Sequence, residues 1–452
     1  MSLAATSFPP GGLSPHTPIP LGTTFNGEPF SLTLPKAMNF NVGVVGASGS
    51  GKTTILSHMI EQYHMRGIMV VVLDTQGDQG HGRSGIDPSL IHRVTFRYGK
   101  SEGQINPLTI PMNVDGGGPY AAIEDAIEVV RLLKPTLGDL QTGDLRSMMK
   151  QCLKRFGIDQ ADPATWSNPG PSWVDFRDHV RECAGGAQAG ASADFFHSLG
   201  KAVKLGVAME EGRQPNLPDE YRDVGIEGYL PDGAQRMKVD EDGIKEYIRM
   251  MSGQLLEDCI RNKQMDIRQP DRKRLASLEM TVSNMVESGL FGDDALSLKP
   301  SRINVFDLSK VSTAHLIALI HLLLKRMLSL AIRSCRELNS PLPSMMVVLD
   351  EAKLAVQTSK NMISPINRIA PEGRKYGLGL MVGVQHMGHL NTEITSNLAT
   401  KLLLPVDSDM EAETRRRMNV RKADMDMLKP KSDGLITLNK EAPVPVHLLR
   451  GI

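Results

Sequence analysis

Near the start of the chain, the pattern of hydrophobic and polar residues changes from that of a buried strand to that of a helix. Apolar, β-branched residues at 39–45 lead into a glycine-rich turn, and a helical pattern follows over 52–65. A second continuous apolar run at 68–73 ends at Asp74, which is the profile of a strand buried on both faces of a parallel sheet. Two strands that bracket one helix predict a βαβ unit.

Strand patterns return in the last third of the chain, after a part in which helical patterns alternate with loops. They lie at residues 302–308, 345–349, 379–384, 401–405, 434–438 and 444–448, with a long amphipathic helix near 314–337. We therefore predict an α/β fold whose central, mostly parallel sheet is divided in sequence by an inserted, mostly helical subdomain. The expected segments are an extended N-terminal arm at 1–38, a first part of the core at 39–120, the insertion at 121–300 and a second part of the core at 301–452.

Charge and composition narrow the class of protein. The 452 residues contain 51 Lys and Arg against 51 Asp and Glu, so a nucleic-acid site must rest on local patches rather than on net charge. Four cysteines without CxxC pairing indicate neither a disulfide framework nor a zinc site. No run reaches the ~18 consecutive apolar residues of a membrane span, because Lys325 and Arg326 interrupt residues 315–332. We expect a cytoplasmic protein without a transmembrane segment or signal peptide.

The glycine-rich turn carries the strongest chemical signal. Residues 46–53 read GASGSGKT, which matches GxxxxGK[ST] between a strand and a helix, the context that a phosphate-binding P-loop requires. Its glycines let successive backbone N–H groups face phosphates, and nothing in an ordinary glycine-rich turn requires a lysine there. The predicted ATP ligands are Gly46, Ser48, Gly49, Ser50, Gly51, Lys52, Thr53 and Thr54, with Thr53 also a ligand of Mg²⁺.

A second acidic site follows the run at 345–349. Asp350 is predicted to hold Mg²⁺ and Glu351 to activate the attacking water as a general base. The alternative is a solvated acidic turn at a strand end.

Three further polar residues lie beside predicted strands. Gln385, at the end of the strand at 379–384, suits a sensor of the γ-phosphate or a cap of the next helix. Arg374, before that strand, suits a finger delivered to a neighbouring subunit or an exposed basic turn. Asp74 suits a catalytic role in orienting water or Mg²⁺, or a cap of its own turn.

These motifs resemble the HerA/FtsK superfamily of ring-forming ATPases, most closely its HerA branch, to which type IV secretion ATPases are related. The resemblance rests on GASGSGKT, VVVLDTQGD, QINPL, LDEA, EGRKYGLGLMVGVQ and SNLATKLLL. It implies a RecA-like P-loop core in a homohexamer that couples ATP hydrolysis to translocation of duplex DNA, with a partner enzyme such as a nuclease. After Gln385 the chain reads His386-Met-Gly-His389, where the family often has Arg-Pro.

Two other functions use the same site. A secretion or conjugation ATPase would act on protein or on a membrane channel, and a defence scaffold would use nucleotide to assemble an effector. A DNA motor needs basic residues along its track. The candidates, each with the alternative of a solvated helix face or an interface ion pair, are Arg415, Arg416, Arg417, Arg421 and Lys422, with a second cluster at Arg272, Lys273 and Arg274.

Overall fold

The chain forms two compact units. The structure, a computed structural model, describes residues 12–79, 85–111, 117–186, 272–293, 296–335, 337–356, 364–439 and 441–449. One unit consists of residues 1–179 and 280–452, and the other consists of residues 180–279. The described part of the second unit holds an ion pair between Arg181 and Glu279, whose Nε and Oε1 atoms lie 3.3 Å apart.

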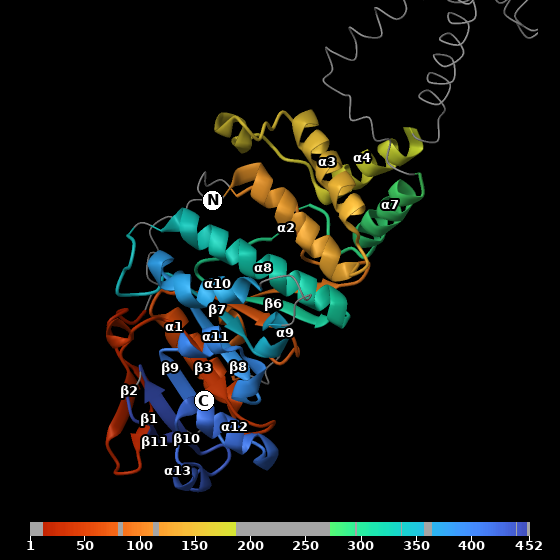
Figure 1. Cartoon of the computed structure of the whole chain (residues 1–452). Coiled ribbons are helices and arrows are strands. Elements are labelled where there is room, and N and C mark those ends of the chain that lie inside the picture. The colour runs from red at the N-terminus through yellow and green to blue at the C-terminus, as the bar shows by residue number, and fades with distance from the viewer. Residues whose placement is uncertain are drawn as a thin grey trace, which may run out of the picture. The chain divides into compact units, whose positions relative to one another are not determined.

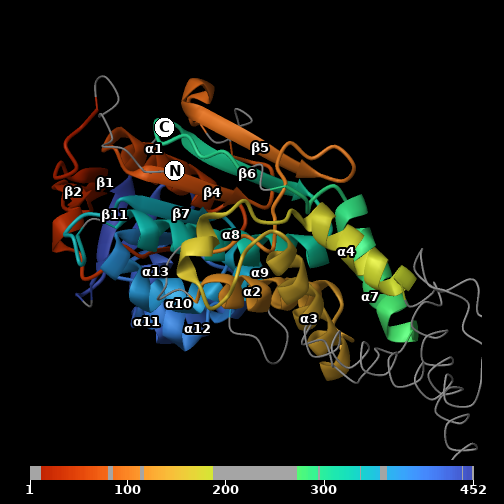
Figure 2. The same cartoon turned by 90° about the horizontal axis from the view of Figure 1, so that it is seen from above.

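One sheet of 11 strands organises the first unit, in the order β2-β1-β11-β10-β9-β3-β8-β7-β4-β6-β5. Figure 2 shows one end of this sheet, where β7, β4, β6 and β5 lie side by side. All neighbours from β9 to β5 pair in parallel, which confirms the predicted α/β class with a mostly parallel sheet. These strands are β9 (Thr400–Leu403), β3 (Val42–Val45), β8 (Leu378–Val384), β7 (Met345–Leu349), β4 (Met69–Asp74), β6 (Ile303–Lys310) and β5 (Ile91–Arg97).

The central strands are buried along their whole length. Every residue of β3, β4, β7 and β8 is buried, and their sequences are almost entirely valine, leucine, methionine and glycine. Strands covered on both faces lose the alternation of polar and apolar residues, and β-branched and unbranched apolar side chains fill both sides. This is why short continuous apolar runs located these strands in the sequence.

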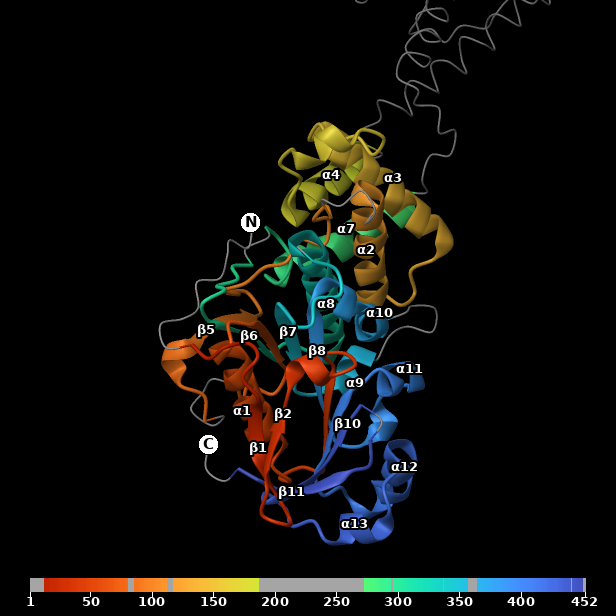
Figure 3. The same ribbon diagram turned by 90° about the vertical axis from the view of Figure 1, so that its left-hand side faces the viewer.

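Helix α1 connects β3 to β4. Helix α8 packs against β7, and α9 and α10 pack against β8 (Figures 1 and 3). The α-helices are α1 (Lys52–Met65), α2 (Gly118–Leu133), α3 (Asp139–Arg155), α4 (Trp173–Gly186), α7 (Arg272–Glu287), α8 (Thr313–Ser334), α9 (Ala352–Val356), α10 (Pro365–Glu372), α11 (Thr392–Ser396), α12 (Ser408–Met418) and α13 (Lys422–Asp426). Short 3₁₀ turns are η1 (Leu34–Lys36), η2 (Pro88–Leu90), η4 (Pro163–Ser167), η7 (Gly373–Tyr376) and η8 (Met387–His389).

Helix α8 is long and apolar enough to cross a membrane by length and composition alone. Of its most apolar window of 18 residues, 61% is buried inside the protein, and long core helices pass the same test. Lys325, which interrupts the apolar run, contacts Asp125 and Glu128 of α2. His321 Nε2 lies 3.0 Å from Glu128 Oε2, so polar contacts join α8 to α2.

The N-terminal segment differs from the predicted extended arm. Strands β1 (Ile19–Thr24) and β2 (Pro29–Leu32) form an antiparallel hairpin, and β1 pairs with β11 (Val444–Leu448). Through β10 (Asp433–Leu438), this antiparallel edge continues the parallel part of the sheet at β9. The hairpin escaped prediction because its strands are short and proline-containing, and six of their ten residues are exposed or half-buried.

The predicted helical insertion, 121–300, has different limits from the second compact unit, 180–279. Helices α2 and α3 fall within the predicted range but belong to the first unit, where α2 contacts α8. Residues 187–271 of the predicted insertion lie outside the described residues. Strand β5, in the predicted first part of the core, has no apolar run because only Val94 and Phe96 of its seven residues are buried.

Hydrogen bonds from the Arg66 side chain connect the segment before β1 to the end of α1. The residue is 1% exposed, and its Nε and Nη2 atoms donate to the carbonyls of Thr17 and Pro18 at 2.8 and 2.6 Å. Its Nη1 donates to the Gln62 carbonyl at 2.7 Å. A buried guanidinium is stable only when its donors are satisfied, so these carbonyls and Arg66 depend on one another.

We expect Arg66→Met to lower the free energy of unfolding by about 2–4 kcal/mol, because several charge-assisted hydrogen bonds disappear together. Chemical denaturation measures the difference. Arg368→Met is the matched control: its pair with Glu372 spans one helical turn and the arginine side chain is 58% exposed. Such a pair contributes less than about 1 kcal/mol. Equal losses in the two variants would contradict the anchoring role of Arg66.

Candidate nucleotide-binding site

The predicted nucleotide residues meet where parallel strands end. The P-loop follows β3, and Asp74 is the last residue of β4. Asp350 and Glu351 follow β7, and Gln385 follows β8. Since these four strands are neighbours and parallel, their carboxyl ends share one edge of the sheet. Two hydrogen bonds connect the segments directly: Gly46 N donates to the Val384 carbonyl at 3.1 Å, and Thr75 N donates to Asp350 Oδ1 at 3.1 Å.

The P-loop has the backbone that its glycines predict. Gly51 has a φ of 107°, in the left-handed region that favours glycine, and it is the N-cap of α1. Helix α1 therefore begins at Lys52 with its first N–H groups directed toward the loop, the arrangement that binds phosphates. Lys52 Nζ donates to the carbonyls of Gly46 and Ala47 at 2.7 and 3.0 Å. Ser48, Gly49 and Thr54 are exposed, and Thr53 is half-buried.

Two buried oxygens at this edge have no hydrogen-bond partner among the described residues: Ser50 Oγ in the loop and Glu351 Oε1 after β7. An unsatisfied buried polar atom costs about 1–3 kcal/mol, so such atoms point to a polar ligand. The donor set of the loop fits the phosphates of a nucleotide. The Thr53 hydroxyl and the Asp350 carboxylate supply the oxygen ligands that Mg²⁺ prefers.

Asp350 is held by the segment after β4. Its Oδ1 accepts hydrogen bonds from the backbone N and the Oγ1 of Thr75, at 3.1 and 2.9 Å. Burial, together with the negative charge of Asp74, raises the pKa of Asp350 to about 7. A divalent cation would oppose this rise in the pKa of Asp350, because a nearby positive charge favours the ionised carboxylate.

Glu351 and Lys52 influence each other's charge. Burial raises the pKa of Glu351, while the positive charge of Lys52 and a hydrogen bond from Gln385 oppose the rise. Burial lowers the pKa of Lys52, and the charges of Glu351 and Asp407 oppose that shift. The predicted phosphate ligand, base and sensor therefore lie within electrostatic or hydrogen-bond range of one another.

The carboxylate of Asp74 is hydrogen-bonded within the turn that follows β4. It is fully buried, and its two carboxylate oxygens accept hydrogen bonds from the backbone N atoms of Gln76, Gly77 and Gln79 at 3.2, 2.7 and 3.0 Å. These contacts favour the capping alternative over a direct role in orienting water or Mg²⁺. Asp74 still affects the site, because its charge is one cause of the raised pKa of Asp350.

Arg374 lies at the opposite edge from the P-loop. It precedes β8, whereas the P-loop follows β3, and these strands are parallel neighbours. Its guanidinium donates to the Met38 carbonyl and lies 5.9 Å from the centre of the Phe40 ring. Arg374 is therefore separated by the length of a strand from the nucleotide residues of its own chain.

The predicted basic cluster is largely paired within the chain. Arg415 lies 3.7 Å from Glu411, Arg417 lies 2.9 Å from Glu413, and Arg421 lies 2.7 Å from Asp424. Arg416 and Lys422 are exposed. For Arg417 the prediction of a DNA contact is not supported by the geometry, since its guanidinium faces the protein. The second cluster, Arg272 to Arg274, begins α7 and belongs to the other compact unit.

Three residues at the site escaped the sequence analysis. Thr75 orients Asp350, Asp407 adds negative charge near Lys52, and Lys431 N donates to the Ser50 carbonyl at 3.0 Å. Asp407 follows β9, which is the parallel neighbour of β3, so the strand-end rule applied to β9 would have found it. Lys431 comes from a loop distant in sequence, and no motif marks it.

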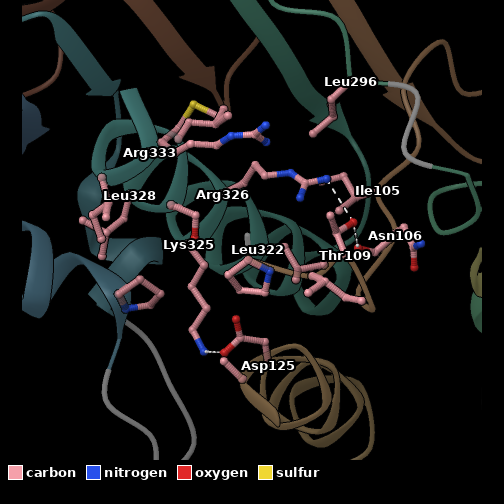
Figure 4. Close-up of a pocket in the computed structure, with 18 of the residues that line it drawn as sticks. Ile105, Asn106, Thr109, Asp125, Leu296, Leu322, Lys325, Arg326, Leu328 and Arg333 are labelled. Carbon is pink, nitrogen blue, oxygen red and sulfur yellow. Dashed lines mark hydrogen bonds and ion pairs between the residues drawn. The ribbon is translucent and has the colours of Figure 1, made fainter. Parts of the chain in front are cut away.

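A large cavity, of about 1540 Å³, lies elsewhere in the first unit (Figure 4). Lys325 and Arg326 of α8 line it with Asn106 and Thr109, and Arg326 Nη2 donates to Thr109 Oγ1 at 3.0 Å. Burial lowers the pKa of Arg326 to about 10. None of the predicted nucleotide ligands lines this cavity.

Fold and site together define a P-loop ATPase core of the RecA-like type. Residues 19–148 match the family described as the central domain of helicase HerA. Among curated proteins, the chain is similar to a probable helicase of Methanocaldococcus jannaschii, with 27% identity over 198 residues that cover 40% of this chain and 36% of that protein. It is also similar to the DNA double-strand break repair helicase HerA of Sulfolobus acidocaldarius, with 29% identity over 141 residues, 30% of this chain and 28% of that protein. The matches thus span about a third of each relative.

Solved structures show the same fold along nearly the whole chain. VirB4 of Thermoanaerobacter pseudethanolicus has a TM-score of 0.64 at 16% identity, covering 97% of this chain and 98% of that one. The bacterial conjugative coupling protein TrwB has a TM-score of 0.52 at 12% identity, covering 97% and 92%. Within the P-loop class, the chain is therefore similar to HerA-type helicases in its first third, and it has the fold of VirB4 and of the conjugative coupling protein TrwB.

Lys52→Ala and Glu351→Gln are expected to fail in different ways. The first removes the charge that neutralises the phosphates and lowers ATP affinity by at least ~10-fold, whereas the second keeps binding but loses the base, worth ~10²–10⁴ in rate. Fluorescent-nucleotide titration and single-turnover hydrolysis measure the two steps. Lys154→Ala, which changes an exposed lysine of α3, controls for loss of a charge. Equal loss of ATP binding in the first two variants would contradict these roles.

Proposed function

We propose that the chain is a ring-forming motor that hydrolyses ATP to translocate duplex DNA, working with a partner enzyme such as a nuclease. The observation that carries the enzymatic part is the meeting of Lys52, Asp350, Glu351 and Gln385 at one edge of the sheet. The similarity to two helicases, one of them acting in DNA double-strand break repair, supports DNA as the polymer. With α8 mostly buried, we place the motor in the cytoplasm.

Each residue of the site has one task in hydrolysis. Lys52 and the loop N–H groups hold the phosphates, and Glu351 accepts a proton from the attacking water. Mg²⁺, held by Thr53 and Asp350, would neutralise charge on the phosphate oxygens. TrwB has been solved with ADP and Mg²⁺, which supports the use of both by this fold. Gln385, hydrogen-bonded to Glu351, is placed to respond to the γ-phosphate.

The position of Arg374 supports a ring. A residue that cannot approach the phosphates of its own chain, yet lies partly exposed at the other edge of the same sheet, suits delivery to a neighbouring chain. In a homohexamer, the Arg374 end of the sheet in one subunit would face the P-loop end of the sheet in the next subunit. Its contacts with Met38 and Phe40 would hold the guanidinium in position before assembly.

Arg374→Ala is expected to leave ATP binding nearly unchanged while hydrolysis by the assembled protein falls by about 10³ or more. Lys375→Ala, at the adjacent exposed lysine, is the matched control and keeps its activity. Mixed assemblies of Arg374→Ala and Glu351→Gln chains regain activity wherever an intact site meets an intact arginine. A protein held monomeric that hydrolyses ATP at the full rate would disprove delivery in trans.

Binding of duplex DNA is best tested at the exposed basic residues of α12 and α13. We expect the double variant Arg416→Glu/Lys422→Glu to weaken binding of duplex DNA and to reduce the dependence of log K on log salt by up to ~0.9 per lost phosphate contact. Basal hydrolysis and assembly stay unchanged. Lys100→Glu/Lys154→Glu, at exposed lysines of other segments, makes the same change in net charge and serves as the control.

The same experiment decides between motor functions. The likeness to VirB4 over 97% of the chain favours a secretion or conjugation ATPase as the second candidate. If the unmodified protein neither binds DNA nor is stimulated by it at low salt, this candidate or an ATP-dependent defence scaffold replaces the DNA motor. If both double variants weaken binding equally, DNA is bound but α12 and α13 are not its track.

A further inference from the structure

A short 3₁₀ turn follows the predicted sensor residue, Gln385. Two residues after Gln385 the chain forms η8, whose backbone closes through bonds from His389 N to the His386 carbonyl and from Leu390 N to the Met387 carbonyl, at 3.1 and 3.2 Å. His386 Nδ1 accepts from Gly388 N at 3.2 Å, and the rings of His386 and His389 lie 3.8 Å apart at their centres. These contacts join residues 386–390 into one compact turn directly after Gln385.

Arg417 of α12 is hydrogen-bonded to this turn. Its Nη1 donates to the carbonyls of Met387 and Leu390, at 3.2 and 2.7 Å, and its Nη2 lies 2.9 Å from Glu413 Oε1. A planar guanidinium carries donors on separate nitrogens in fixed directions, so Nη1 can hold the two carbonyls while Nη2 faces the carboxylate, whereas a lysine has a single nitrogen. A Cβ added at Gly388 would lie 2.6 Å from Glu413 Oε2, so α12 and η8 are also in close contact through the glycine.

The other end of α12 is also tied to the nucleotide residues. Asp407, its N-cap, affects the charge of Lys52 in the P-loop. The helix thus meets the nucleotide site near its beginning through Asp407 and near its end through Arg417 and η8. Arg416, the exposed neighbour of Arg417, lies on the part of the helix turned toward solvent.

We infer that Arg417 is a positioning residue that transmits the nucleotide state sensed at Gln385 to α12. A shift of Gln385 on binding of the γ-phosphate would displace η8, and the two carbonyl bonds would carry α12 with it. The inference rests on the proposed ATPase function and assigns Arg417 to coupling rather than to contact with DNA. A purely structural brace would instead stabilise α12 equally in every nucleotide state.

Hydrogen exchange of α12 tests this without DNA. The full chain is compared with Mg²⁺ and ADP, and with Mg²⁺ and a non-hydrolysable ATP analogue, following peptides that cover residues 408–426. We expect the exchange rates of the unmodified protein to differ between the two states by about fivefold or more, the lower end of typical coupling. In Arg417→Gln this difference is lost, while the affinity for each nucleotide stays within about twofold. In Arg416→Gln the difference remains.

Arg417→Lys separates coupling from stability. It keeps the positive charge and the pair with Glu413, so it melts like the unmodified protein. Its single Nζ cannot occupy the positions of both Nη1 and Nη2, so the carbonyl bonds to η8 are lost together with most of the difference in exchange. The inference is overturned if the unmodified protein shows no nucleotide-dependent exchange in α12. It is also overturned if Arg417→Lys and Arg417→Gln retain the full difference.

Duplex DNA then separates this inference from the proposed function. If DNA binds, its affinity should differ between the ATP-analogue and ADP states in the unmodified protein, but not in Arg417→Gln. A chain that binds no DNA yet shows the expected pattern of exchange would refute the DNA motor and leave the role of Arg417 supported.

Discussion

The parallel pairing of β3, β8, β7 and β4 is the constraint on which the site depends. Because the backbone hydrogen bonds fix the relative positions of these strands, the residues that follow them have to share one edge. The P-loop is hundreds of residues distant in sequence from the acidic pair and the sensor. These segments need no further contacts with one another to stay close, because the hydrogen bonds of the sheet already hold them together.

This convergence also concentrates charge. Asp74, Asp350 and Glu351 gather in a buried region, and burial raises the pKa of all three. Backbone N–H groups satisfy Asp74, Thr75 satisfies one oxygen of Asp350, and Lys52 faces Glu351. The remaining negative charge makes the edge a natural place for a cation, in agreement with the use of Mg²⁺ by this class of fold.

The sequence predicts those parts of the structure whose signal is local. Strands such as β4 and β7 are continuous apolar runs, and the P-loop has its own motif, so both could be located without a structure. Strand β5 and the hairpin of β1 and β2 could not, because their residues alternate weakly and their stability comes from pairing with distant strands. The run of arginines in α12 shows a further limit: its composition suggests a basic surface, but the carbonyls that receive Arg417 lie 27 and 30 residues away and no sequence pattern links them.

Strand β3 connects the two halves of the proposed mechanism. Its four residues have the P-loop at one end, and just before the other end lie Met38 and Phe40, the contacts of Arg374. In a ring, the segment that responds to a subunit's own nucleotide would therefore be continuous with the support of the arginine offered to the next subunit. Because β3 is hydrogen-bonded to a neighbouring strand on each side, a displacement at the P-loop of one subunit would also affect the support of the arginine that faces the next subunit.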